Sequence, residues 1–126
     1  MRLGGDPPSP FERPFGFSRL VYAGGLVVVG GTTSIDHNGV VHGGTPYEQT
    51  IAILGKIEHE LARVGAGLAD VIENRVYVTD ISRAEEVGRA HGEFFGDLRP
   101  CMTMVEVSGL IDPRMMVEIE AMGAVR

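Results

Sequence analysis

The sequence predicts an α+β domain of order β-β-α-β-α-β-β, with two helices packed on one face of a mixed sheet. Three observations support this prediction: short Val-rich runs bounded by glycine pairs, two segments with helix-start signals, and two apolar runs near the C-terminus. The chain has 126 residues, which is the length of one domain able to bury a hydrophobic core.

The first two strands are expected to form a hairpin. Residues 17–23 have the composition of a short strand, Gly24-Gly25 suits a tight turn, and "LVVVGGTT" from Leu26 is rich in valine. Before them, the first 14 residues hold four of the seven prolines. We therefore predict an extended or loosely ordered N-terminal arm over 1–14 and a single domain over 15–126.

The first helix is predicted over about residues 46–64. Thr45 and Glu48 have the spacing of a capping box, and Pro46 suits the first helical position. An apolar stripe at helical spacing follows, and Gly65 is a natural left-handed stop.

The middle of the chain then predicts a strand over 71–79 and a second helix. The strand alternates, which places four side chains on one face: Ile72, Asn74, Val76 and Val78. Ser82 followed by Glu85 indicates the start of the helix, which is expected to end near Gly96.

Two further strands are predicted at the C-terminus, in "TMVEVSGL" (103–110) and "MMVEIEAMG" (115–123). Their alternation is expected to turn four residues toward the helices: Val105, Val107, Val117 and Ile119. The opposite face then carries Met104, Glu106, Glu118, Glu120 and Met122. A face that mixes methionine with carboxylates fits neither a core nor a solvated surface, so we interpret it as an oligomer interface.

Composition excludes several classes of function. The net charge is −6 and the 11 basic residues are scattered, which argues against a nucleic-acid partner. No apolar stretch reaches the roughly 18 residues that span a membrane. The four histidines lack metal-ligand spacing, so no metal site is expected. The single cysteine excludes an intrachain disulfide and fits a reducing compartment. The N-terminus lacks the charged-then-apolar order of a signal peptide, so we expect a cytoplasmic location.

The order of four segments resembles the RidA/YjgF family, also called L-PSP endoribonuclease: "GFSRLVYAGGLVVVGG", "YEQTIAILGKIEHELARVGAGLADVIENRVYVTDI", "HGEFF" and "RPCMTMVEVSGLIDPRMMVEIEA". The resemblance runs from about residue 15 to 126. It implies a chorismate-mutase-like fold and a homotrimer with a central barrel and intersubunit clefts. It also implies hydrolysis of reactive enamines or imines to a 2-keto acid and ammonia, without a metal or organic cofactor.

The resemblance also implies roles for individual residues. Glu118 matches the family's pocket glutamate, which positions water, and Phe17 takes the place of a pocket aromatic that is normally Tyr. Gly30 and Gly31 fall where the family has a Ser-Gly pair. The deaminase branch has an Arg two residues after a proline, and that Arg clamps the substrate carboxylate. Here Met102 occupies its position, and methionine can neither neutralise a carboxylate nor donate a hydrogen bond to it.

Three more residues are candidates for the same cleft. Arg19 lies two residues after Phe17, so both side chains are expected on one face of the strand. There Arg19 is expected to bind the substrate carboxylate in place of the arginine that Met102 replaces. The alternative is a surface Arg paired with an acid on a neighbouring strand. Thr103 offers a hydroxyl or a backbone amide, and Glu120 shares the strand face of Glu118.

Three functions follow from these observations. The first is a deaminase-type hydrolase for a small carbonyl, imine or carboxylate metabolite, with specificity altered by Met102. The second is a non-catalytic trimer that binds or senses a small molecule; Met102 favours it, whereas Glu118 favours the first. The third is an endoribonuclease or translation inhibitor, which the acidic net charge disfavours.

Overall fold

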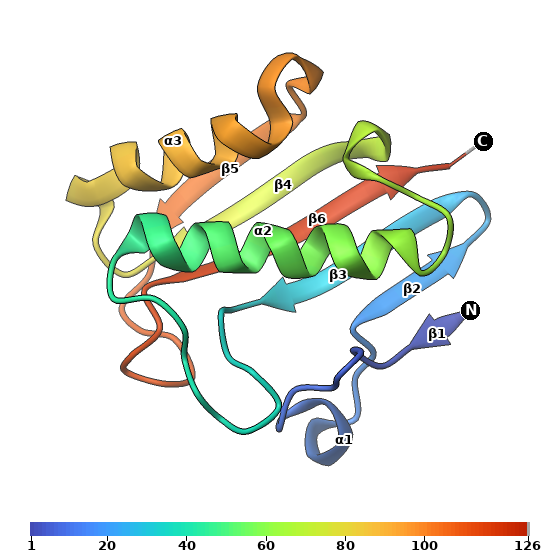
Figure 1. Cartoon of the computed structure of the whole chain (residues 1–126), viewed down its shortest axis with the longest axis horizontal. Coiled ribbons are helices and arrows are strands. Elements are labelled where there is room, and N and C mark those ends of the chain that lie inside the picture. The colour runs from blue at the N-terminus through green and yellow to red at the C-terminus, as the bar shows by residue number, and fades with distance from the viewer. Residues whose placement is uncertain (126) are drawn as a thin grey trace.

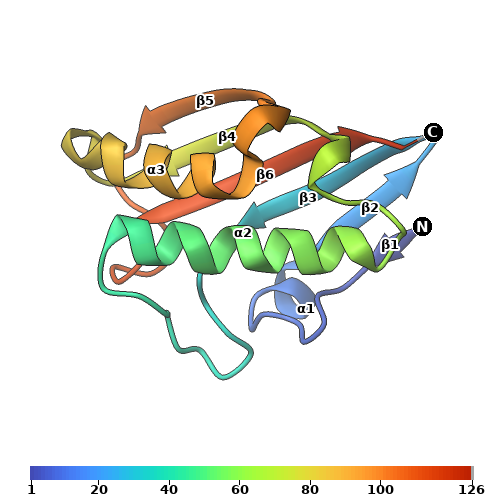
Figure 2. The same ribbon diagram turned by 45° about the horizontal axis from the view of Figure 1, so that its top comes forward.

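The computed structural model describes residues 1–125 and shows a six-stranded sheet with two long helices on one face (Figures 1 and 2). The strand order is β1-β2-β3-β6-β4-β5, and only the β4/β5 pair is parallel. The elements are β1 Arg2–Leu3, α1 Glu12–Phe15, β2 Leu20–Ala23, β3 Leu26–Thr32, α2 Pro46–Ala62, β4 Val71–Val78, α3 Ala84–Phe95, β5 Cys101–Glu106 and β6 Val117–Ala124. The predicted fold class is confirmed.

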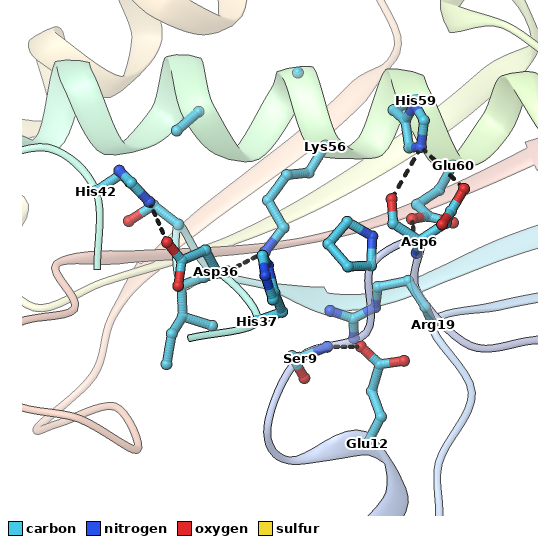
Figure 3. A pocket seen from close by; sticks show the side chains of 15 residues that line it. Asp6, Ser9, Glu12, Arg19, Asp36, His37, His42, Lys56, His59 and Glu60 are labelled. Atoms are coloured by element: carbon cyan, nitrogen blue, oxygen red, sulfur yellow. Dashed lines mark hydrogen bonds and ion pairs between the residues drawn. The ribbon is translucent and has the colours of Figure 1, made fainter. Parts of the chain in front are cut away.

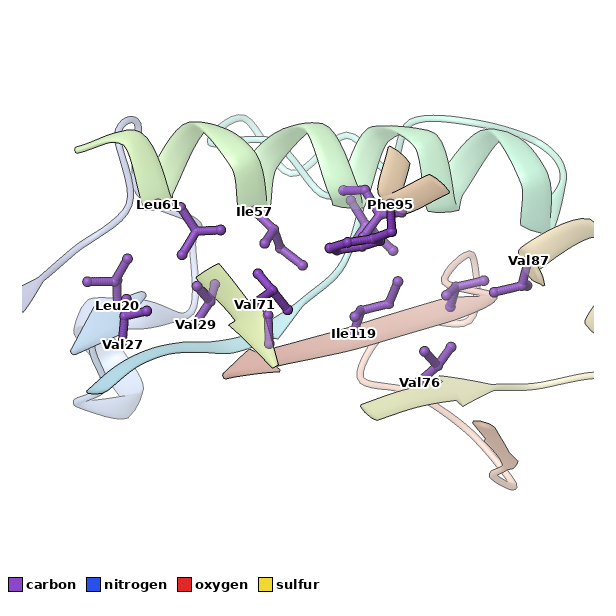
Figure 4. Packing of buried hydrophobic residues seen from close by; sticks show 14 of the residues in the cluster. Leu20, Val27, Val29, Ile57, Leu61, Val71, Val76, Val87, Phe95 and Ile119 are labelled. Carbon is purple, nitrogen blue, oxygen red and sulfur yellow. The ribbon is translucent and has the colours of Figure 1, made fainter. Parts of the chain in front are cut away.

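Helix α2 begins where its sequence predicts. The Thr45 hydroxyl accepts the backbone N–H of Glu48 at 3.1 Å, and Pro46 is the first helical residue. The inner face of α2, including Ile57 and Leu61, packs against Val29 and Ile119 of the sheet (Figure 4). Each of these side chains is almost fully buried, which stabilises the fold by about 1.5–3 kcal/mol per residue.

Helix α3 starts later than predicted. Residues 81–83 form a 3₁₀ turn, and α3 begins at Ala84. The Asp80 carboxylate caps this turn by accepting the Ser82 backbone N–H at 3.0 Å and the Ser82 hydroxyl at 2.6 Å. The predicted Ser82–Glu85 capping box was therefore wrong, because Asp80 already binds the Ser82 side chain. The predicted end near Gly96 is confirmed.

The predicted inner face of β4 needs one correction. Asn74, Val76 and Val78 are buried as expected, but Ile72 is 48% exposed. The pairing of β4 with β6 shifts register next to Ile72, so Val71 takes the buried place instead.

Strand β5 has the opposite phase from the prediction. Its parallel pairing sets Met104 beside buried Val76, whereas Val105 lies beside Tyr77 on the open face of the sheet. Met104 packs against the core, and Val105 is 43% exposed. The placement of these two residues was therefore predicted wrongly, and Glu106 also leaves the open face to accept the Ile81 backbone N–H at 3.0 Å.

Strand β6 alternates as predicted. Val117, Ile119 and Ala121 are buried under the helices. Glu118 and Glu120 are half-buried on the other face. The acids near the C-terminus thus share one face of a central strand.

The N-terminal segment is held against the domain. Strand β1 pairs with β2 at the sheet edge, and the Glu12 carboxylate accepts the backbone N–H groups of Gly5 and Ser9, each at 2.7 Å. Glu12 itself is only 4% exposed. Residues 1–14 are therefore anchored to the domain by a buried carboxylate.

Candidate functional site

A pocket of about 240 Å³, here called the cleft pocket, gathers four of the predicted site residues: Phe17, Arg19, Gly31 and Glu118. Its apolar lining comes from the N-terminal segment and from the connection between β5 and β6, and includes Phe11, Phe15, Ile111 and Met115. A charged pair within a mostly apolar pocket is the usual composition of a small-molecule site.

Arg19 is buried inside this pocket rather than lying at the surface. It is 5% exposed, its Nη2 donates to the carbonyl of Gly31 at 2.8 Å, and its guanidinium carbon lies 5.6 Å from the centre of the Phe17 ring. Burial lowers the pKa of Arg19, and attraction from Glu12 and Glu118 opposes this. The guanidinium remains protonated in proteins, so the pocket has a permanent positive charge.

Glu118 supplies the carboxylate of the pocket. Burial raises its pKa, attraction to Arg19 lowers it, and repulsion from Glu120 raises it, with a net upward shift. A carboxylate whose pKa moves toward neutrality becomes a better general base for water, and its protonated form becomes available as a general acid.

Two glycines make room for this charged pair. The register of β3 against β6 shifts between Val29 and Thr32, which marks a β-bulge at Gly30 and Gly31. A Cβ atom on Gly31 would lie 2.6 Å from Glu118 Oε2, and one on Gly30 would lie 3.2 Å from Arg19 Nη2. The bulge and the close approach of side chains therefore occur together, and glycine is required most strictly at position 31.

Met102 and Thr103 lie far from the cleft pocket within one chain. Met102 pairs with buried Asn74 on the helix side of the sheet, and Thr103 pairs with Arg75 on the open side. Strands β6 and β4 separate β5 from Gly31 on β3, a distance of roughly 14 Å at the normal strand spacing. Neither residue lines the cleft pocket of its own chain.

Glu120 occupies a separate place on the open face. It accepts a short hydrogen bond from the hydroxyl of Tyr77, which raises the pKa of that tyrosine. It lines a shallow depression of about 90 Å³ together with Arg75 and Met122. Of the two neighbouring acids on β6, the structure brings Glu118 alone to Arg19 and Phe17.

The sequence interpretation missed the contribution of the N-terminal segment. Phe11 and Phe15 line the cleft pocket, and their rings lie 5.7 Å apart at their centres. The available signal was that three of the chain's five phenylalanines, Phe11, Phe15 and Phe17, fall within seven residues.

Residues 1–125 contain neither a candidate metal site nor a candidate membrane-spanning helix. No group of three or more His, Cys, Asp or Glu side chains in that range is placed to hold a metal ion. None of the helices described there has both the length and the apolar character needed to cross a membrane.

Comparison with known proteins agrees with the fold. A profile of the Endoribonuclease L-PSP family matches residues 11–125. An uncharacterised Streptomyces coelicolor protein is 41% identical over 89% of this chain and 84% of its own length. The 3-aminoacrylate deaminase RutC of Acinetobacter baylyi is 29% identical over 96% of this chain and 93% of its own.

A solved structure gives the same result. The crystal structure of a YjgF/YER057c/UK114 family member from Mycobacterium tuberculosis superposes with a TM-score of 0.89 and 46% identity, covering 99% of this chain and 98% of that one. The described core of the fold, including the strands that carry Gly31 and Glu118, is therefore shared. This chain belongs to the Endoribonuclease L-PSP family, which is the RidA/YjgF family.

Proposed function

We propose that the protein is a homotrimeric, deaminase-type hydrolase that acts on a small imine or enamine bearing a carboxylate. The observation that carries this proposal is that one pocket is lined both by buried Arg19, which donates to the Gly31 carbonyl, and by Glu118, whose pKa is raised. The Acinetobacter baylyi relative, named as a 3-aminoacrylate deaminase, supports the same reaction class.

In this proposal Arg19 binds the substrate carboxylate in place of the arginine that Met102 replaces. Within the described residues, one N–H of Arg19 is used on the Gly31 carbonyl. A guanidinium has five N–H donors, so others remain for a ligand. The changed position of the positive charge alters which substrates fit.

Glu118 handles protons in the proposed reaction. It takes a proton from a water molecule and passes it to the imine nitrogen while the water oxygen bonds to the imine carbon, which forms a neutral carbinolamine. It then takes the proton of the carbinolamine hydroxyl and gives it to the amino nitrogen, the C–N bond breaks, and ammonia leaves as the carbonyl forms. The sum is imine plus water giving ketone plus ammonia, with no redox partner needed.

The open face of the sheet supports the proposed trimer. Both long helices lie on the other side (Figure 2), and three exposed aliphatic residues lie on the open face or its border: Val28, Ile72 and Val105. Exposed aliphatic residues on a sheet face that no helix covers support association. In a closed ring, β5 of one subunit could bring Met102 and Thr103 to the cleft pocket of the next.

The main test measures the hydrolysis of imines to 2-keto acids and ammonia. An amino-acid oxidase generates a panel of imines in situ, and the rate of 2-keto acid formation is compared with and without the protein. We expect acceleration for imines with a carboxylate. Failure to accelerate any imine in a panel of acidic, neutral and aromatic substrates would contradict the hydrolase proposal.

A second candidate is a non-catalytic trimer that binds or senses a small carboxylate, which the methionine at position 102 favours. Saturable binding without ammonia release would identify it. The net charge of −6 disfavours the endoribonuclease alternative, and RNA cleavage that survives stringent purification and disappears in Glu118→Gln would support it instead. The exposed thiol of Cys101 is consistent with a reducing cytoplasm, which we include in the proposal.

Replacing Arg19 with Ala is expected to weaken carboxylate binding strongly. Loss of a charge-assisted hydrogen bond corresponds to roughly 10- to 100-fold in affinity. Arg19→Lys is the control, because it keeps the charge but loses the planar donor group. We expect intermediate affinity for Arg19→Lys by calorimetry. An Arg19→Ala variant that binds every tested carboxylate as well as wild type would rule out the clamp.

Gly31→Ala is expected to reduce turnover up to about 100-fold, because the new methyl group displaces the Glu118 carboxylate. Gly30→Ala is the matched control, since its methyl group meets Arg19 at the longer distance of 3.2 Å. We expect the position-31 variant to lose more activity than the position-30 variant at similar unfolding temperature. The opposite order would show that Gly31 does not serve the carboxylate.

A further inference from the structure

A second and larger pocket of about 390 Å³, here called the helix-side pocket, lies between α2, the N-terminal segment and the loop from β3 to α2 (Figure 3). Its size falls within the range of small-molecule sites. Ser9, Arg19 and Ile35 line both this pocket and the cleft pocket, so the two are neighbours. Glu118 lines the cleft pocket and is absent from the lining of this one.

Two buried polar atoms of this pocket lack a partner. Within residues 1–125, neither Ser34 Oγ nor Arg19 Nε makes a hydrogen bond. Ser34 is 2% exposed, and both residues line the pocket. An unsatisfied buried polar group costs about 1–3 kcal/mol, so such groups in native proteins usually indicate a missing partner.

Lys56 offers a third donor from α2. Its Nζ donates to the carbonyl of Thr33 at 2.7 Å and to that of Ile35 at 2.8 Å. An ammonium group has three N–H donors, so one is left. Figure 3 shows Lys56 reaching from α2 into the same space that Arg19 enters from the sheet side.

The buried acids next to these donors already have partners. Glu12 accepts the backbone N–H groups of Gly5 and Ser9, and Glu60 accepts that of Asp6 and binds Arg63. The buried atoms without a partner that line this pocket are therefore an arginine N–H donor and a hydroxyl, which suits an oxygen-bearing anion.

The rest of the lining limits the ligand further. Pro7, Ile35 and Ala52 give apolar surface, which suits a short hydrocarbon tail. Asp6 and Asp36 also line the pocket, and their charges disfavour a dianion. The chemistry that fits is a small monocarboxylate with an apolar tail.

We propose that the helix-side pocket is a second ligand site, which binds a small monocarboxylate through Arg19 Nε, Ser34 Oγ and Lys56 Nζ. This site differs from the proposed reaction site by its lining and does not depend on turnover there. The two share Arg19, so variants that separate them must change other residues.

The test uses calorimetric titration of the full chain with butyrate as the probe. Ser34→Ala removes one donor, and Gly55→Leu fills the pocket from α2, where a Cβ atom on Gly55 meets open space. We expect saturable binding by wild type, roughly tenfold weaker binding by Ser34→Ala, and loss of binding by Gly55→Leu. Ile111→Ala is the control, because Ile111 lines the cleft pocket but not the helix-side pocket, and its expected affinity equals that of wild type.

Three results would overturn the proposal. They are absence of saturable binding by the wild-type protein, equal affinity of wild type and Ser34→Ala, and weakened binding in Ile111→Ala, which would place butyrate in the cleft pocket. Thermal unfolding of each variant checks its folding. Gly55→Leu leaves the polar groups unchanged, so it decides the case if Ser34→Ala is unstable.

Discussion

Glu118→Gln is expected to lose ammonia release by at least about 100-fold and, at the same time, to unfold at a higher temperature than wild type near neutral pH. Glutamine keeps the shape of the side chain but cannot take a proton from water. It also removes a carboxylate charge whose burial opposes ionisation, as the raised pKa of Glu118 indicates. Catalytic loss and stability gain thus have one physical cause.

The stability gain should depend on pH in a defined direction. The pKa of Glu118 in the folded state lies above its ordinary value of 4.5, so folding favours the protonated form. Its contribution to the free energy of unfolding is fully present below pH 4.5 and is lost as pH rises through the folded-state pKa. The unfolding temperatures of variant and wild type should therefore be similar in acid and diverge toward neutrality, with the variant higher.

Glu120→Gln is the matched control for this prediction. Glu120 lies on the same strand face as Glu118 but is bonded to Tyr77, outside the cleft pocket. We expect this variant to keep most of the turnover, provided that sedimentation shows an unchanged oligomer. Equal losses in the two variants would contradict the assignment of Glu118 as the proton-transfer group, as would wild-type turnover in Glu118→Gln.

Elements with local signals were predictable from the sequence. Thr45, Pro46 and Glu48 mark the start of α2 by contacts within one helical turn, and the side chains involved lie within four residues of one another. Strand β6 alternates apolar and acidic residues, so its buried face can be assigned without knowing its neighbours. In β5, apolar residues occupy both sets of alternating positions, so the sequence alone does not show which side chains face the helices. Its orientation depends on parallel pairing with β4, which the local sequence does not specify.

The candidate site was predictable only in part because it depends on non-local packing. Gly31 on β3 and Glu118 on β6 meet Phe17 and Arg19, which lie just before β2, in one pocket. The burial of Arg19 requires the bulge on the neighbouring strand, and no residue close to it in sequence indicates this. Met102 was placed near the site by resemblance, but its position at the far side of the sheet follows from strand order.

Val28→Asp is expected to convert the proposed trimer into a monomer and to abolish turnover. Val28 is 41% exposed on the open face, beside Met122, so a single chain can accept an aspartate there. In the proposed trimer the same carboxylate would be buried without a partner in each of the three subunits. The penalty for burying an unpaired charge is several kcal/mol per site. Dissociation would then separate Met102 and Thr103 from the neighbouring cleft pocket.

Sedimentation and circular dichroism check this prediction, with Val40→Asp as the matched control. Val40 is also exposed, at 48%, but lies in the loop between β3 and α2, away from the open face. We expect Val28→Asp to sediment as a folded monomer without activity, and Val40→Asp to behave as wild type. A wild-type protein that is monomeric and active, or a Val28→Asp variant that remains trimeric, would show that the open face is not the subunit interface. A monomeric Val28→Asp variant with full turnover would instead show that the cleft pocket is complete within one chain.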